Sequence, residues 1–574
     1  MARHRAALSL TRQIVTGALV VMATLPVSAR DNGGLAAAFY DGRTLRQTTI
    51  DANSAQAPFP GGDRLTPLGS LWKLFVYAYV IDNGISASPY VCQGSHPDEV
   101  FCCQPGARVG MDAALGKSCG LYFEPVRLTI QAEAWREYWV SRKALRMSWL
   151  VSLDQLRPEQ RVPVSELLRA LHALGQSPLV LSRLRTALGG VLIDGTAAGE
   201  VRYLGGIVRA KTYTWGGGPA GKYVGGFAGW LNDGSVVWVS GQGSSTEVLR
   251  RWHHVFEPLL VRPNADPSRE CVTVRFFQRY PVRQVLSTAT NQPVSDAALS
   301  GGYRVFFANG NTLDFRTSGG LRAVQEEGQV RITGMFSLNE YVARVIDREA
   351  RAESHEEAVK AFAITARTYL IQNAKQSHGC YAIDDSTRYQ RVAIDDPTPL
   401  ARQVSAWTDS LVLSGAMVHY SLDDSSGGRL SWTEAQKLAV NGYHFDEILK
   451  SAFPSARIAV SEDRTQRVCA REPQLERWLS GQSRIWSRRL MRVPGYEAPS
   501  DVAVCRLDAG APYADTDTNR IYVGHDTTSE DRITLAHEYL HLAFKSHPSG
   551  VDNRFVESMA RELITSDEGE HGHN

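Results

Sequence analysis

Two histidines and a glutamate near the C-terminus have the types and spacing of a site that could bind a metal ion and activate water. They belong to the stretch HEYLH at residues 537–541. In a helix, His537 and His541 lie one turn apart on the same face, so both imidazole rings can reach one cation. Glu538 between them can accept a proton from a water molecule at that cation. The alternative is a pair of surface histidines on an amphipathic helix.

A tetrahedral zinc site also needs a third protein ligand. Glu557 lies on the next expected helix, after a turn at residues 548–550. This layout resembles that of gluzincin metallopeptidases, whose third zinc ligand is a glutamate on a following helix. His547 is the rival ligand, since its distance from His537 matches the metzincins, but Phe544 stands where metzincins need a glycine. The resemblance therefore favours Glu557 and implies zinc as the cofactor.

A serine and a lysine in the N-terminal half form a candidate nucleophile and base. Ser70 and Lys73 are three residues apart at the start of an apolar helical run, so their side chains share one helix face. A desolvated lysine without its proton could activate the serine hydroxyl. Ser118 follows in the segment SCG, and Lys211 and Thr212 begin the segment KTYT.

In this order, the segments SLWK, SCG and KTYT resemble the SxxK, SxN and KTG motifs of penicillin-binding proteins and serine β-lactamases. The resemblance implies that a D-Ala-D-Ala peptide acylates Ser70, with Lys73 as the base. It also implies that Ser118 relays protons and that Lys211 and Thr212 bind the substrate carboxylate. We therefore expect a transpeptidase-like first domain.

Two positions depart from these motifs. Gly120 replaces the asparagine of the second motif, which removes an amide that normally contacts substrate. Tyr213 replaces the glycine of the third motif, and its bulky side chain could close the groove along the strand edge. The alternative is therefore an inherited fold whose motif residues serve structure or peptide binding.

Four segments in the middle of the chain resemble, in the same order, those of the SpoIID family (sporulation stage II protein D). They are LNEYVARVIDRE (338–349), EAVKAFAITARTY (357–369), SSGG (425–428) and NGYHFDEILK (441–450). SpoIID proteins are lytic transglycosylases, and Glu349 stands at the position of their catalytic glutamate. Partial burial should raise the pKa of this carboxylic acid, so that it can protonate the glycosidic oxygen.

In such a reaction the sugar's own 6-hydroxyl closes the anhydro ring, so a second carboxylate is not required. Gln390 matches a family glutamine and is expected to line the substrate groove. Ala350 departs from the methionine that usually follows the catalytic glutamate. The alternative for Glu349 is an ordinary exposed helix glutamate, since some SpoIID relatives bind glycan or activate other hydrolases without cutting.

Several domains must position these groups, because 574 residues are too many for one ordinary domain. We expect a signal peptide at 1–29, a penicillin-binding-protein-like domain at 30–265, a SpoIID-like domain at 266–455 and an HExxH metallopeptidase-like domain at 456–574. The expected fold class is α+β multidomain, with a transpeptidase-like α/β domain, a SpoIID-like α+β domain and a small, mostly helical zincin-like domain. In the middle domain, alternating residues predict a β-rich part at 270–335, and Ser337 and Ser354 are expected to cap the two following helices.

The N-terminus is typical of a secretory signal. Basic residues precede an apolar run at 14–25, and small residues at 27–29 offer a cleavage site. The mature chain is then expected in the periplasm without a stable membrane span, and an uncleaved anchor is the alternative. Four of the eight cysteines form a cluster that is expected to hold one or two disulfides rather than zinc: Cys92, Cys102, Cys103 and Cys119. A formal charge of only +2 gives no reason to expect a nucleic-acid partner.

The arrangement as a whole resembles the YfaQ-like family of predicted secreted bacterial proteins, whose relatives are often encoded near bacterial α2-macroglobulins. Two of the resemblances point to peptidoglycan, one to its peptide stems and the other to its glycan strands. The leading hypothesis is a periplasmic peptidoglycan-remodelling protein that cleaves glycan at Glu349. The alternatives are a non-catalytic peptidoglycan-binding scaffold and a zinc peptidase acting on a protein partner such as an α2-macroglobulin.

Overall fold

The computed structural model describes residues 34–570 with several gaps. The residues outside the description within this range are 60–61, 97, 100–101, 145, 195–199, 217–221, 262–270, 327, 351–353, 378–379, 388–389, 417, 423–428, 462–471, 501, 507–511, 517–518 and 525–528. The expected signal peptide at 1–29, the SSGG segment and the expected domain boundary at 265 therefore lie outside the described residues.

One antiparallel sheet of six strands, in the order β3-β2-β1-β10-β9-β8, forms the centre of the N-terminal region. Its strands are β1 (Leu35–Tyr40), β2 (Leu45–Ile50), β3 (Gln56–Pro58), β8 (Val208–Gly216), β9 (Tyr223–Leu231) and β10 (Val236–Gln242). Successive side chains point to opposite faces, so Leu35 enters one hydrophobic core and Ala36 the other. This pairing differs from the parallel βαβ pairing that an α/β domain implies.

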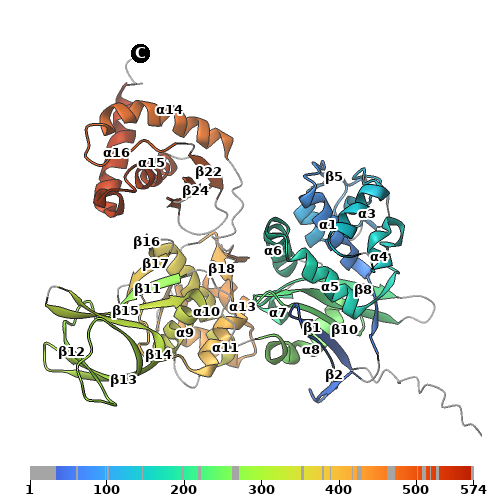
Figure 1. Ribbon diagram of the computed structural model, residues 1–574, viewed down its shortest axis with the longest axis horizontal. Coiled ribbons are helices and arrows are strands. Elements are labelled where there is room, and N and C mark those ends of the chain that lie inside the picture. The colour runs from blue at the N-terminus through green and yellow to red at the C-terminus, as the bar shows by residue number, and fades with distance from the viewer. Residues whose placement is uncertain are drawn as a thin grey trace, which may run out of the picture.

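Helices cover both faces of this sheet (Figure 1). On one face lies α8 (Ser245–Leu260), and on the other lie α1 (Trp72–Asp82), α3 (Ala132–Ser141) and α5 (Val164–Leu174). The remaining elements are β4 (Leu65–Pro67), β5 (Tyr90–Val91), β6 (Arg108–Val109), α2 (Met111–Gly116), α4 (Ser148–Val151), β7 (Arg161–Pro163), α6 (Pro178–Asp194) and α7 (Glu200–Leu204). The mostly buried helix α1 carries the candidate base into the centre of this region.

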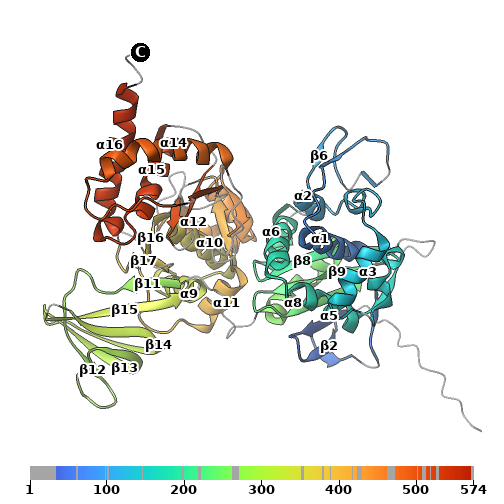
Figure 2. The same cartoon turned by 45° about the horizontal axis from the view of Figure 1, so that its top comes forward.

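A seven-stranded sheet forms the middle region, in the order β12-β13-β14-β15-β11-β17-β16 (Figure 2). Its strands are β11 (Cys271–Arg275), β12 (Val282–Ser287), β13 (Ala297–Phe307), β14 (Thr312–Glu326), β15 (Gln329–Ser337), β16 (Lys375–Ser377) and β17 (Cys380–Asp384). The predicted β-rich part at 270–335 is thus confirmed. Only the pairing of β11 with β17 is parallel within this sheet of the described chain.

Helices α9 (Leu338–Glu349) and α10 (Glu356–Asn373) follow, with α11 (Pro399–Trp407), α12 (Trp432–Val440) and α13 (Phe445–Ala452). Ser337 caps α9 as predicted, because its hydroxyl accepts the backbone N–H of Glu340. The predicted cap at Ser354 is wrong by one residue. His355 occupies the N-cap position, and its Nδ1 accepts the N–H of Glu357.

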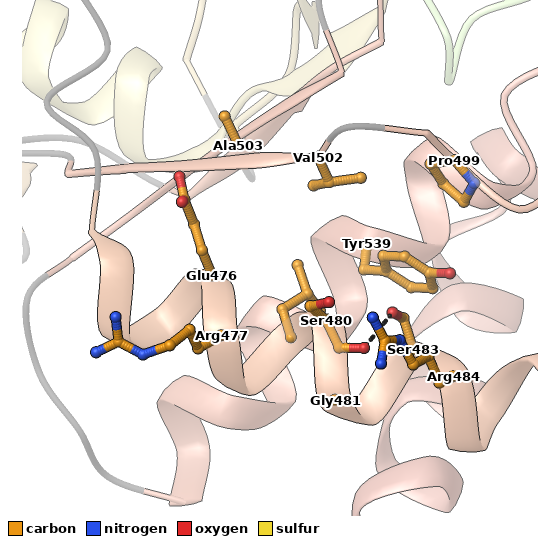
Figure 3. Close-up of a pocket in the computed structure, with 11 residues that line it drawn as sticks. Glu476, Arg477, Ser480, Gly481, Ser483, Arg484, Pro499, Val502, Ala503 and Tyr539 are labelled. Carbon is orange, nitrogen blue, oxygen red and sulfur yellow. Dashed lines mark hydrogen bonds between the residues drawn. The ribbon is translucent and has the colours of Figure 1, made fainter.

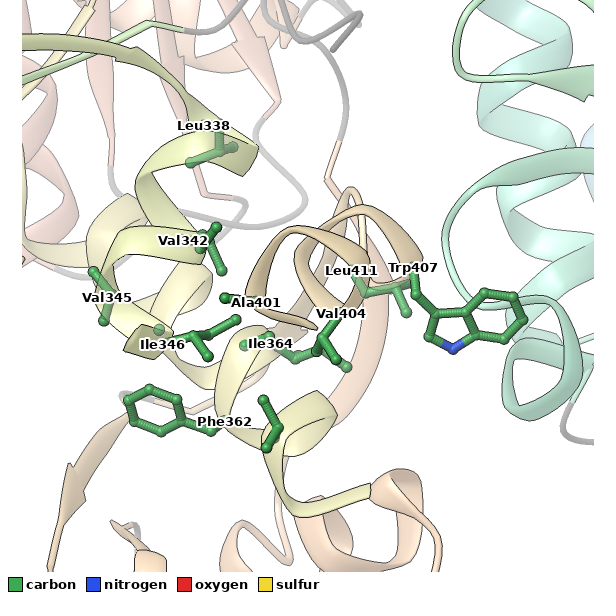
Figure 4. Packing of buried hydrophobic residues seen from close by; sticks show 14 of the residues in the cluster. Leu338, Val342, Val345, Ile346, Phe362, Ile364, Ala401, Val404, Trp407 and Leu411 are labelled. Carbon is green, nitrogen blue, oxygen red and sulfur yellow. The ribbon is translucent and has the colours of Figure 1, made fainter. Parts of the chain in front are cut away.

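The first and middle regions share one continuous hydrophobic core. Figure 4 shows part of it, with Trp407 pointing away from α9 and α10 toward the first region. Gly205 follows α7, and a side chain there would collide with the backbone and ring of Trp407. The contact also includes a hydrogen bond from the Gly206 N–H to the Trp407 carbonyl oxygen, at 2.7 Å. Tight backbone packing therefore joins the two regions.

Two small sheets complete the middle region: β18 (Leu411–Ser414) with β21 (Arg457–Val460), and β19 (His419–Ser421) with β20 (Arg429–Ser431). Because β21 pairs with β18, the chain leaves the middle region just beyond the expected boundary at 455.

The C-terminal region has a separate core and mixes helices with a small sheet. Its elements are α14 (Pro473–Leu490), β22 (Ala503–Arg506), β23 (Tyr513–Asp515), β24 (Arg520–Val523), α15 (Ser529–Ala543) and α16 (Asn553–Glu570). The three strands pair in the order β22-β24-β23, so this region is less purely helical than expected. No helix among the described residues combines the length and apolar character required to cross a bilayer.

Disulfides close the cysteine cluster of the first region, as predicted. Cys92 is bonded to Cys103, and Cys102 to Cys119. A third disulfide joins Cys271 at the start of β11 to Cys380 at the start of β17. This last bond fixes the strand that leads into the loop facing Glu349.

Candidate functional site

Ser70 lies in a short 3-10 helix (Gly69–Leu71) that runs directly into α1. Gly69 has φ +47°, a left-handed conformation that side-chain-bearing residues adopt rarely. A Cβ atom at Gly69 would also lie only 3.1 Å from the Cβ of Tyr213 on β8. Glycine at this position therefore lets the nucleophile turn pack closely against β8.

Three predicted residues of the first region meet in one hydrogen-bonded group. Lys73 Nζ donates to Ser70 Oγ at 3.1 Å and to Ser118 Oγ at 3.3 Å, and Ser118 Oγ donates to Ser70 Oγ at 2.9 Å. Burial, together with the positive charge of Lys211, lowers the pKa of Lys73 to about 7. A large fraction of Lys73 is therefore a neutral amine near neutral pH, as a base for the Ser70 hydroxyl must be.

Ser118 joins this group from a constrained turn, and the other two predicted residues, Lys211 and Thr212, lie on β8. Ser118 has φ 59°, a left-handed conformation uncommon outside glycine, and the disulfide-bonded Cys119 follows it immediately. Lys211 is buried, and its Nζ donates to the Thr212 carbonyl oxygen at 3.0 Å. Thr212 is buried on the face of β8 that also bears Thr214, whose hydroxyl accepts the N–H of Ser245 in α8.

The two departures from the motifs have different consequences. Tyr213 is 1% exposed, and its hydroxyl lies 3.4 Å from Thr66 Oγ1. Its ring therefore fills the core beside Gly69, and the expectation that it closes the groove is wrong. Gly120 lies next to Lys73, with space for a side chain, because a Cβ atom there would approach Lys73 Cε no closer than 3.8 Å.

Glu349, the last residue of α9, has the environment expected of a general acid. Its Oε1 accepts the backbone N–H of Arg391 at 3.1 Å. Burial raises the pKa of Glu349, and the charge of Asp385 adds to this effect, whereas Arg391 and Arg348 oppose it. The side chain is half-buried rather than exposed, which disfavours the interpretation of Glu349 as an ordinary surface glutamate.

Gln390 lies deeper than a groove-lining residue would. It is 1% exposed, its Oε1 accepts the hydroxyl of Tyr341 at 2.7 Å, and its Nε2 donates to the Ala366 carbonyl oxygen at 3.1 Å. These bonds join α9 to α10. The predicted contact of Gln390 with substrate is therefore disfavoured, and a supporting role fits better.

The sequence interpretation missed Asp385, which follows β17. Burial raises its pKa, and its Oδ1 accepts the N–H of Val392 at 2.9 Å. The only signal in the sequence was a pair of adjacent aspartates, Asp384 and Asp385, a few residues before Gln390.

The histidines of α15 are oriented as a pair of zinc ligands would be. The Nε2 atoms of His537 and His541 lie 3.1 Å apart, and Gly550 O lies 2.6 Å from His541 Nδ1. Burial lowers the pKa of His541, which favours a neutral ring whose Nδ1 donates to this carbonyl and whose Nε2 lone pair is available. Glu538 is 7% exposed on the same helix. The donor set thus fits the first two ligands of a zinc ion.

Neither candidate third ligand, Glu557 or His547, is oriented toward the Nε2 atoms of the histidine pair. Glu557 Oε2 lies 2.9 Å from Nδ1 of His537, and its Oε1 accepts Nε of Arg561 at 2.7 Å. Glu557 therefore orients the ring of His537 rather than facing the pair of Nε2 atoms. His547 Nδ1 accepts the N–H of Ser549 and caps the short 3-10 helix Pro548–Val551.

A cavity of about 830 Å³ lies between α14 and Tyr539 of α15 (Figure 3). Tyr539 is two residues from each of the paired histidines, so it points to the opposite side of the helix. The cavity is therefore separate from the histidine pair. Its lining includes Arg477, Ser480 and Arg484.

Residues 94–215 and 428–549 match the family described as "Predicted secreted protein (DUF2300)", and residues 326–407 match the family described as "Stage II sporulation protein", SpoIID. The Escherichia coli (strain K12) protein named "Uncharacterized protein YfaQ" is 39% identical over 500 residues, which cover 87% of this chain and 90% of that protein.

Solved structures similar to part of the chain include a class D β-lactamase from Sebaldella termitidis ATCC 33386 and the C-terminal domain of the Bacillus licheniformis BlaR penicillin-receptor. The first is 12% identical, covers 40% of this chain and 92% of its own, and has a TM-score of 0.28. The second is 13% identical, covers 40% of this chain and 88% of its own, and has a TM-score of 0.25.

Proposed function

Because this chain belongs to the YfaQ family of predicted secreted proteins and carries a SpoIID domain, we propose that it remodels peptidoglycan in the periplasm by cleaving glycan strands at Glu349. The observation that carries this proposal is the half-buried Glu349 carboxyl, whose pKa is raised by burial and which a backbone N–H holds in place. A raised pKa favours the protonated form of Glu349, which is the form that can give a proton to a glycosidic oxygen.

The proposed reaction needs one carboxyl group in two roles. Protonated Glu349 gives its proton to the glycosidic oxygen as the bond from that oxygen to C1 breaks. The resulting carboxylate then accepts the proton of the 6-hydroxyl of the same sugar, whose oxygen forms the new bond to C1. The products are a shortened strand and a 1,6-anhydro sugar end, and Glu349 regains its proton.

Digestion of purified sacculi by the mature chain tests the proposal. We expect soluble anhydro-muropeptides, detected by mass spectrometry, and a loss of about 10²- to 10⁴-fold in Glu349→Gln, the usual contribution of a general acid. Ser70→Ala and His537→Ala are the matched controls and should release the same products at the same rate. Intact sacculi with bound protein would instead favour the scaffold hypothesis.

A second candidate function is acylation of Ser70 by the peptide stem. The hydrogen-bonded group of Ser70, Lys73 and Ser118 favours it. Lys73 would accept the hydroxyl proton as Ser70 Oγ bonds to the carbonyl carbon of the penultimate D-Ala, and the terminal D-Ala would leave after taking up a proton through Ser118. Covalent labelling by a fluorescent penicillin, absent in Ser70→Ala, would support this function, and equal labelling of both proteins would exclude it.

A third candidate is a zinc peptidase in the C-terminal region, favoured by the converging Nε2 atoms of His537 and His541. These residues would hold the ion, which would supply Lewis-acid chemistry, and Glu538 would accept the proton of a water molecule. Zinc content measured by mass spectrometry, on protein lacking residues 571–574, should fall in His541→Ala and remain in His547→Ala. Equal zinc content in both variants would contradict the site.

A further inference from the structure

One short loop binds two carboxylates through consecutive backbone N–H groups. The Arg391 N–H donates to Glu349 Oε1 at 3.1 Å, and the Val392 N–H donates to Asp385 Oδ1 at 2.9 Å. Adjacent residues are about 3.8 Å apart along the chain, so the two bound carboxylate oxygens lie at most on the order of 10 Å from each other. The loop therefore fixes Asp385 within electrostatic reach of Glu349.

The backbone also fixes the other side of Asp385. Its N–H donates to the Arg275 carbonyl oxygen at 3.0 Å, which extends the register of β11 and β17 beyond the end of β17. The disulfide between Cys271 and Cys380 ties the far ends of the same two strands. Asp385 is thus held by a rigid strand pair, while Glu349 comes from the end of α9.

We propose that Asp385 is a positioning residue for Glu349: the shared loop holds an ionised aspartate beside the glutamate, so that Glu349 keeps its proton until substrate arrives. The catalytic role of this pairing rests on the proposed cleavage of glycan at Glu349. Burial raises the pKa of both carboxyls, and aspartate otherwise ionises at lower pH than glutamate, so we assign the charge of the pair to Asp385. Repulsion from this charge then disfavours ionisation of Glu349.

Some of the remaining groups around Glu349 favour its ionised form and others do not. Arg348 on α9 and Arg391 on the loop attract its ionised form, and both also act on Asp385. Tyr341 on α9 and the partly buried Tyr420 on β19 lie within electrostatic reach of Glu349, and burial raises the pKa of each, so both stay neutral. Asp385 is therefore the group among these that favours the protonated acid.

A direct titration of Glu349 tests the inference whether or not the protein cuts glycan. The mature chain is labelled with ¹³C-carboxyl glutamate and titrated by NMR, and the Glu349→Gln variant identifies the signal. We expect Glu349 to titrate above the ordinary glutamate range in the wild type and at lower pH in Asp385→Asn. Asparagine keeps an oxygen that can accept the Val392 N–H, so this variant should fold. Asp384→Asn is the matched control, because Asp384 pairs with Arg275 instead, and it should not move the titration.

The pH dependence of anhydro-muropeptide release gives the second readout. The rate falls as Glu349 loses its proton, so we expect this alkaline decline to move to lower pH in Asp385→Asn and to stay in place in Asp384→Asn. An unchanged titration, or a decline that does not move in a protein that cuts, would overturn the inference. In a further outcome, the wild type releases no anhydro-muropeptides while the titration of Glu349 still moves in Asp385→Asn. That result would support the pairing of the two carboxyls and overturn only the proposed function.

Discussion

Burial and a second lysine decide the chemistry of Lys73. The ordinary pKa of a lysine lies near 10.4, whereas burial and the nearby charge of Lys211 bring that of Lys73 to about 7. The protonated form is disfavoured because no acidic side chain hydrogen-bonds to Nζ, whose bonds in the described structure go to Ser70 and Ser118. A small change in local charge should therefore change the activity near neutral pH.

We expect penicillin labelling of Ser70 to rise with pH through about 7 and then level off, because the neutral amine of Lys73 becomes the major form above its pKa. Removing the positive charge in Lys211→Met should raise the pKa of Lys73 and move this rise to higher pH. Labelling rates measured from pH 5.5 to about 9 check both expectations. A rate independent of pH in the wild type would contradict the role of Lys73 as base.

Gly120 offers a test of whether the missing motif amide limits acylation. Its backbone is α-helical (φ −65°, ψ −43°), and an added Cβ atom meets only Lys73 Cε at 3.8 Å. Gly120→Asn should therefore fold normally and label about fivefold faster, the gain from one hydrogen bond of about 1 kcal/mol. Gly120→Ala supplies the Cβ atom without the amide, so its labelling rate should stay at that of the wild type. Equal rates in the two variants would show that the amide contributes nothing.

At the scale of elements, local spacing made several features predictable. The i, i+3 spacing of Ser70 and Lys73 and the i, i+4 spacing of His537 and His541 follow from helix geometry alone, and both pairs lie within hydrogen-bond distance. The β-rich part at 270–335 was likewise visible as alternation.

Long-range contacts were not predictable in this way. The burial of Tyr213 depends on the space left by Gly69, on another element. Asp385 and Glu349 bind the same loop only because the chain returns to the end of α9. The orientation of Glu557 likewise depends on how α16 packs on α15. No local pattern in the sequence encodes these distances, since each depends on tertiary packing.

The disulfide between Cys102 and Cys119 should control the turn that presents Ser118. Replacing both cysteines by alanine is expected to cost about 3 kcal/mol of folding free energy and to slow the labelling of Ser70, because the left-handed Ser118 loses its neighbouring constraint. Thermal unfolding and labelling rates measure the two effects. The double replacement of Cys92 and Cys103 is the matched control: it should cost similar stability and leave the labelling rate nearly unchanged. Equal slowing in both proteins would contradict a specific role for the Ser118 turn.

At the scale of the whole molecule, charge as well as apolar packing joins the first and middle regions. Lys360 on α10 lies 3.0 Å from Glu257 on α8, and both side chains are buried. Glu356 and Glu357 also attract Lys360, and the three carboxylates raise its pKa despite burial. Arg202 on α7 pairs with Asp446 on α13 at the same interface, at 2.7 Å. The two regions should therefore unfold together rather than as independent domains.

Lys360→Met tests this coupling, because it leaves the Glu257 carboxylate buried without its cation. Breaking a buried ion pair from one side typically costs about 3–5 kcal/mol, so we expect a clear fall in the midpoint of thermal unfolding. The double variant Glu257→Gln with Lys360→Met removes the unpaired charge and should recover much of this loss. Calorimetry checks the coupling, since a joined unit gives one transition for the two regions. The loss of stability in the double variant could instead equal the sum of the losses in Lys360→Met and Glu257→Gln. The two side chains would then not interact, and apolar packing alone would hold the regions together.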